Sequence, residues 1–82
     1  MFSGITLEVD PEFSTGYVSF SKGNVANTVA LSSDLNLDLD SNGSVLGLEL
    51  LHLDAKLPIN RLVSEFGLDG DMLEKLSEQL LK

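Results

Sequence analysis

The sequence contains no cysteine, no tryptophan and a single histidine among its 82 residues. Without cysteine the chain can form no disulfide, no thiolate nucleophile and no Cys-based zinc site, and one histidine leaves little from which to build a transition-metal site. No apolar run approaches the roughly 20 residues that span a bilayer, and no cationic stretch precedes an apolar one near Met1 as in a secretory signal. We therefore expect a cytoplasmic protein that does not contact membranes.

Basic residues are scarce as well. Five Lys and Arg stand against thirteen Asp and Glu, and the formal net charge is -8 at pH 7. This charge repels nucleic-acid backbones and anionic lipids and favours a basic partner. A chain this short holds one hydrophobic core and buries only about 60 to 65% of the surface of its unfolded form, which makes self-association a natural supplement to its stability. We expect one domain over residues 1–82.

Alternation of apolar and polar residues with period two predicts a sheet over about residues 5–53. The expected strands cover residues 5–10, 17–20, 25–31, 35–39 and 45–53, and turn residues separate them. The turn Lys22-Gly23-Asn24 predicts a tight hairpin between the second and third strands. The sum is an antiparallel meander of about five strands.

The register of the last hairpin follows from the pair Asn42-Gly43, which is typical of a type I′ turn. A turn centred there sets Leu37 opposite Leu48 and gathers six leucines on one face. These are Leu35, Leu37, Leu39, Leu46, Leu48 and Leu50. The reverse face would carry Asn36, Asp38, Asp40, Val45, Gly47 and Glu49.

The period changes after residue 54 and predicts two short helices, at about 58–66 and 71–81. Pro58 suits a first helical turn and Gly67 a left-handed C-cap, while Asp71 with Glu74 resembles a capping box. Each helix has an apolar stripe that can cover the leucine face of the sheet. The predicted fold class is α+β, with two C-terminal helices packed on one face of the sheet.

Residues 38–49 match the spacing of a calcium-binding EF-hand loop, with Asp38, Asp40, Asn42, Gly43 and Glu49 at the required positions. Such a loop needs flanking helices, whereas both flanks here have the period of strands. In the hairpin register Glu49 also lies too far from Asn42 to close one coordination shell. We therefore predict no metal and no cofactor, and we keep a cation-binding or acid/base site on the Asp38, Asp40 and Glu49 face as a lesser alternative.

No catalytic constellation is recognisable. His52, the only imidazole, is predicted at the rim of the leucine face, and no G-x-S-x-G nucleophile elbow or similar device accompanies it. We expect a protein that is not an enzyme.

Gly47 stands among leucines within a strand, which indicates a bulge or a large cross-strand side chain, such as that of Tyr17, on the reverse face. This face is also where uncovered apolar residues would cluster and mark an interface. The candidate interaction patch comprises Tyr17, Asn36, Val45, Gly47 and Leu51, with Asp38 and Glu49 beside it.

Three segments taken together, residues 9–12, 17–20 and 37–51, resemble a bacterial family called "domain of unknown function 2283" over about residues 5–54. The residues that match the family pattern are Asp10, Pro11, Glu12, Tyr17, Asp38, Gly43, Gly47 and Glu49. The chain departs from the pattern at Ser14, where the family usually has Asp, and at Gly16, where an apolar residue is common. The resemblance implies a small β-rich bacterial domain with no catalytic residues to transfer, and it implies an antitoxin-like role through family members that neighbour small toxins.

The function that we expect is a non-enzymatic protein-protein interaction domain, which forms a homodimer or binds a small basic protein. An antitoxin-like inhibitor of a small basic toxin is the alternative. For a dimer we expect an interface on the fifth strand or on the reverse face near Tyr17, with the second helix as another option.

Overall fold

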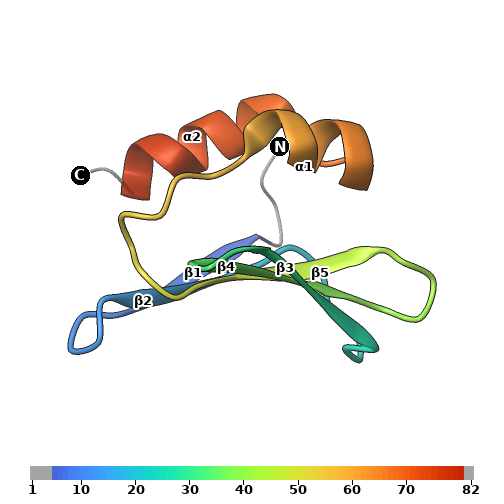
Figure 1. Ribbon diagram of the computed structural model, residues 1–82, viewed down its shortest axis with the longest axis horizontal. Coiled ribbons are helices and arrows are strands. Elements are labelled where there is room, and N and C mark those ends of the chain that lie inside the picture. Colours follow the sequence, from blue (N-terminus) through green and yellow to red (C-terminus); the bar gives the residue numbers. More distant parts are fainter. Residues whose placement is uncertain (1–4, 81–82) are drawn as a thin grey trace.

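The computed structural model describes residues 5–80 and has an antiparallel sheet followed by two helices (Figure 1). The strands are β1 (Thr6–Asp10), β2 (Thr15–Ser19), β3 (Asn27–Ser32), β4 (Leu35–Leu39) and β5 (Val45–Leu50). The helices are α1 (Ile59–Phe66) and α2 (Gly70–Leu80), so residue 81 of the expected second helix lies outside the described residues. The predicted α+β class with five strands and two C-terminal helices is confirmed.

The order of the strands in the sheet is β1-β2-β5-β4-β3, and all neighbours are antiparallel. The predicted meander is therefore wrong at one step, because β2 pairs with β5 rather than with β3. The turn at Lys22-Gly23-Asn24 does not close a hairpin, and the connection instead runs past the end of the β4–β5 hairpin, where Phe20 N donates to Leu46 O and Ala26 N donates to Leu39 O. Burial explains the choice, since Val18 is fully buried opposite Leu48 in this arrangement, whereas β3 is largely exposed.

The β4–β5 register agrees with the prediction over most of its length, with Leu35 opposite Leu50 and Leu37 opposite Leu48. The ladder then shifts between Asp38 and Leu39, and Leu39 lies opposite Val45 instead of Leu46. A bulge adds one residue to one strand and so reverses the facing of the side chains beyond it.

Because of this bulge, two side chains lie elsewhere than predicted. Val45 was expected on the reverse face, but it packs against the core cluster. Leu46 was expected in the core and is indeed buried, but it lies outside the core cluster, and its side chain meets Gly23 in the β2–β3 connection.

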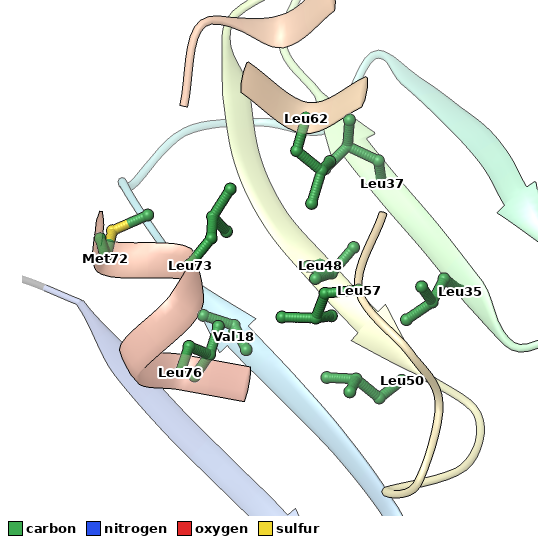
Figure 2. Packing of buried hydrophobic residues seen from close by; sticks show 10 residues of the cluster. All are labelled: Val18, Leu35, Leu37, Leu48, Leu50, Leu57, Leu62, Met72, Leu73 and Leu76. Atoms are coloured by element: carbon green, nitrogen blue, oxygen red, sulfur yellow. The ribbon is translucent and has the colours of Figure 1, made fainter. Parts of the chain in front are cut away.

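Both helices cover the same face of the sheet (Figure 1). Side chains from α1, α2 and the segment before α1 point toward the leucines of β4 and β5 and toward Val18 of β2 (Figure 2). The buried residues of this cluster are Val18, Leu35, Leu37, Leu48, Leu50, Leu57, Leu62, Met72, Leu73 and Leu76. The apolar stripes of the two helices and the leucines of the sheet therefore form one core.

The ends of the helices match the prediction except at one cap. Gly67 ends α1 in the left-handed conformation (φ 70°), and its N–H bonds to the carbonyl of Val63. At the start of α2 the capping side chain is Asp69, whose Oδ1 accepts hydrogen bonds from the N–H groups of Asp71 (2.9 Å) and Met72 (3.3 Å). The predicted capping box at Asp71 is wrong, because the helix begins one residue earlier than expected. Neither helix within residues 5–80 has the length and apolar character to cross a membrane.

Candidate functional site

The candidate site is the face of the sheet that the helices leave open, which we call the uncovered face. Successive residues of a strand point to opposite faces, so the positions between the core residues of each strand lie on it. Among residues 5–80 no helix covers this face (Figure 1). Its central positions are Glu8, Tyr17, Thr28, Asn36, Asp38, Gly47 and Glu49.

Tyr17 and Gly47 form the centre of the uncovered face. The Tyr17 side chain leaves β2 and fills the space above Gly47 on β5, where a Cβ would lie 2.6 Å from ring Cε2 and closer still to Cζ and the hydroxyl oxygen. Only glycine fits under the ring. This finding confirms that the glycine leaves room for Tyr17, and the bulge in the same strand lies directly beside it.

Asp38 receives the Tyr17 hydroxyl on the far side of β5. The phenol donates to Asp38 Oδ2 at 2.7 Å, and Thr28 Oγ1 on β3 donates to Asp38 Oδ1 at 2.8 Å. One carboxylate thus links side chains from β2, β4 and β3. Thr28 is not among the predicted site residues, although the predicted meander already has its strand beside β4. The missing information is the register of this pair, which places Thr28 opposite Asp38.

Burial raises the pKa of the Tyr17 phenol to about 12, and the hydrogen bond to Asp38 and the negative charges of Asp38 and Glu49 act in the same direction. The phenol is consequently protonated throughout the physiological range and acts as a hydrogen-bond donor.

Thr28, Asp38 and Gly47 are cross-strand partners and form one row across the sheet. A second polar pair lies in the neighbouring row. Asn36 and Glu49 are cross-strand partners, and Asn36 Nδ2 donates to Glu49 Oε1 at 3.0 Å. Tyr17 is the partner of Glu49 on its other side, and Glu8 is the partner of Tyr17. The two polar rows therefore lie side by side on the uncovered face.

The three acidic residues of the EF-hand spacing make separate hydrogen bonds. Asp38 accepts the two hydroxyls, Glu49 accepts from Asn36, and Asp40 Oδ1 accepts the N–H groups of Asn42 (2.8 Å) and Ser44 (2.9 Å) within the turn. Gly43 has the positive φ (83°) that was predicted, but Asn42 does not, and Gly43 N donates to Asp40 O. The turn is therefore centred on Ser41-Asn42, and the predicted type I′ turn at Asn42-Gly43 is wrong. Within residues 5–80 no three His, Cys, Asp or Glu side chains come together as a metal site would require.

His52 lies beyond the end of β5. Its side chain is 62% exposed, and Nε2 is 3.7 Å from Asp34 Oδ1. The strand ends at Leu50, three residues earlier than predicted. His52 is therefore at the rim of the protein, as expected.

The structure brings together three of the five residues of the candidate interaction patch, namely Tyr17, Asn36 and Gly47. Val45 is turned toward the helices by the bulge. Leu51 is exposed beyond the end of β5, where its N–H donates to Asp34 O. The β1–β2 register also places Glu8 beside Tyr17, a residue that is not part of the predicted patch.

The fold and the site define a small two-layer α+β domain with a polar, helix-free sheet face. The chain belongs to the family described as "Protein of unknown function (DUF2283)", whose model matches residues 6–53. The match covers the sheet and every residue of the uncovered face, and it ends before α1. Comparison with curated proteins and with solved structures finds no match.

Proposed function

We propose that this protein is a non-enzymatic protein-protein interaction domain that binds a basic partner on its uncovered face. The observation that supports this function best is the distribution of charge in the sheet. All four charged residues within the five strands are carboxylates, and all four alternate with the core positions, so that they belong to the uncovered face. They are Glu8, Asp10, Asp38 and Glu49.

These carboxylates surround an aromatic side chain. Tyr17 has Glu8 on one side and Glu49 on the other in the same row of the sheet. Lysine and arginine side chains recognise this combination, because the charged group pairs with a carboxylate while the stem or guanidinium packs on the ring. Tyrosine is also a residue type that is enriched at protein interfaces.

The internal hydrogen bonds favour binding over acid/base chemistry. Both oxygens of Asp38 already accept a hydroxyl, and Glu49 is held by Asn36. Carboxylates fixed in this way form a preorganised acidic surface that loses little entropy on binding a cationic side chain.

A small basic toxin is one partner with this chemistry. The antitoxin-like role is therefore a special case of the proposed function, and it is tested with a small basic protein that is encoded beside this one. Inhibition of that protein by the domain is the expected result for an antitoxin.

The test of the proposed function is an NMR titration of the ¹⁵N-labelled protein with a lysine- and arginine-rich peptide. We expect amide shifts at Glu8, Tyr17 and Glu49, and binding that weakens as salt increases. Shifts confined to the helices would overturn the proposal.

Two charge-matched variants make the titration specific. Glu8→Gln with Glu49→Gln removes two charges from the uncovered face, whereas Glu74→Gln with Glu78→Gln removes two from exposed positions of α2. We expect the first pair to weaken peptide binding clearly more than the second. Equal losses would mean that only net charge matters.

A further inference from the structure

We infer that the free edge of β3 is a docking site for β3 of a second copy, which joins two sheets into one antiparallel ten-stranded sheet across a twofold axis. This inference concerns a different surface from the uncovered face and does not depend on the basic partner. It begins from the fact that β1 and β3 are the two edges of the sheet.

The two edges differ in charge. An edge strand exposes unpaired backbone groups, and charged side chains are a common protection against pairing with another chain. β1 carries Glu8 and Asp10 among its five residues. β3 has the sequence NTVALS without a charged residue, and the neutral stretch extends from residue 23 to residue 33. In a chain with a net charge of -8, β3 is thus the edge that lacks this protection.

The hydrogen-bond alternation indicates which groups of β3 point outward. Leu51 N donates to Asp34 O, so even-numbered residues of β4 bond toward β5 and odd-numbered ones toward β3. Val29 is the partner of Leu37 and therefore bonds inward. The backbone groups of Thr28 and Ala30 are left facing away from the sheet.

The outward-facing backbone groups of one β3 are complementary to those of a second, antiparallel β3. With a twofold axis at Val29, Thr28 of one copy lies opposite Ala30 of the other, and each of these two pairs exchanges two backbone hydrogen bonds. Val29 then meets Val29 of the second copy at a non-hydrogen-bonded position, which is a favourable place for a β-branched pair. No like charges face each other in this register.

A second copy is the occupant that the charges favour. The neutral edge offers nothing to attract a basic peptide, since the carboxylates of the sheet are on the uncovered face. Two neutral edges, in contrast, can meet without placing carboxylates of the two copies in direct contact. Val29 and Leu31, which pack against the core cluster and are half-buried, would extend the apolar layer toward the second copy.

The shape of β3 limits the paired segment. The ladder between β3 and β4 shifts between Ala30 and Ser32. A bulge bends an edge strand, so pairing is confined to about residues 27–31 and the dimer is weak and dependent on concentration. Because the remaining charge of each copy is repulsive, the dimer should tighten as salt rises, whereas a complex with a basic partner loosens.

Cysteine cross-linking tests the register, and the absence of native cysteine makes a single introduced thiol unambiguous. Val29→Cys should form a disulfide-linked dimer under mild oxidation, since facing residues at a non-hydrogen-bonded position are within disulfide reach. Asn27→Cys, two residues away on the same strand, should not cross-link, because the axis separates its two copies by roughly 14 Å. Val9→Cys tests the other edge. Cross-linking of Val9→Cys or Asn27→Cys in preference to Val29→Cys would overturn the proposed pairing.

Sedimentation equilibrium of the cysteine-free protein provides the second measurement. We expect the dimer fraction to increase with salt, and we expect Ala30→Lys to abolish it, because this exposed position then places a charge at the joined edges. Val9→Lys adds the same charge to β1 and should leave the dimer intact. A protein that is monomeric at about 0.5 mM at both low and high salt would overturn the inference and would leave the proposed binding of a basic partner unaffected.

Discussion

The side chain of Tyr17 crosses β5 above Gly47 and reaches Asp38 on the opposite neighbouring strand. A tyrosine on β2 is thereby hydrogen-bonded to β4, two positions away in the sheet. This arrangement depends on the missing side chain at residue 47, because any Cβ there would occupy the space of the ring. Tyr17 and Gly47 together therefore allow one side chain to connect β2 with β4 across the uncovered face.

We predict that Gly47→Ala destabilises the protein by about 1–3 kcal/mol, since the new methyl group forces the Tyr17 ring to move from a packed position. Urea denaturation followed by circular dichroism measures the loss. Gly70→Ala is the control, because the nearest side-chain atom to a Cβ there is 3.4 Å away, and its effect should be small. In a Tyr17→Ser background, Gly47→Ala should cost less than in the parent; an undiminished cost would show that the ring is not what excludes the methyl group.

The titration of Tyr17 provides a second prediction. With one tyrosine and no tryptophan, the absorbance of phenolate reports on this residue alone. We expect a midpoint at about 12 in the folded protein, compared with 10.0 for an unperturbed phenol. Asp38→Asn should lower the midpoint only in part, because burial is the larger cause.

The same shift has a consequence for stability. Because the folded pKa lies above the unfolded one, the folded state holds the proton more tightly, and this contribution is complete below pH 10 and is lost as the pH rises toward 12. Tyr17→Phe should remove this part of the pH dependence. A parent and variant that lose stability in parallel between these pH values would contradict the assignment.

A third prediction concerns the start of α2. Asp69→Ala should cost about 0.5–2 kcal/mol, because it removes the acceptor of two N–H groups at the helix terminus. Asp71→Ala, two residues later, should cost a few tenths of a kcal/mol through the helix dipole alone. Thermal unfolding of both variants checks the order, and a larger effect of Asp71→Ala would restore the cap that the sequence alone suggested.

Local features of the fold were predictable from sequence, and long-range ones were not. The alternating leucines determine the β4–β5 register from Leu35 to Asp38, because one residue of slip would place Asp38 in the core. The position of β3 in the strand order could not be predicted from such local features. The turn residues Gly23 and Asn24 favour pairing of β3 with β2, its neighbour in the sequence. The burial of Val18 against β5 is the reason that β2 pairs with the distant β5 instead.

The site shows the same division. The space at Gly47 was predictable, since a glycine within a leucine-rich strand indicates that a neighbouring group needs the room a side chain would fill. The bond from Thr28 to Asp38 depends on the register between β3 and β4, and the orientation of Val45 depends on a bulge next to the turn. Errors therefore concentrate where a single backbone irregularity reverses the facing of a side chain.

The bulge itself can be tested at Val45. If alternation continued unbroken through β5, Val45 would be exposed on the uncovered face, and Val45→Asp would be tolerated. In the structure Val45 packs against the core cluster, so an aspartate there loses apolar contacts and desolvates a carboxylate. We expect Val45→Asp to destabilise the protein by about 1 kcal/mol or more.

Ser41→Asp is the matched control, because it adds the same charge at an exposed position of the adjoining turn. Urea denaturation of the two variants gives the comparison. Equal midpoints would mean that Val45 faces solvent and that β5 pairs with β4 without the bulge, in which case Leu46 would return to the core beside Leu48.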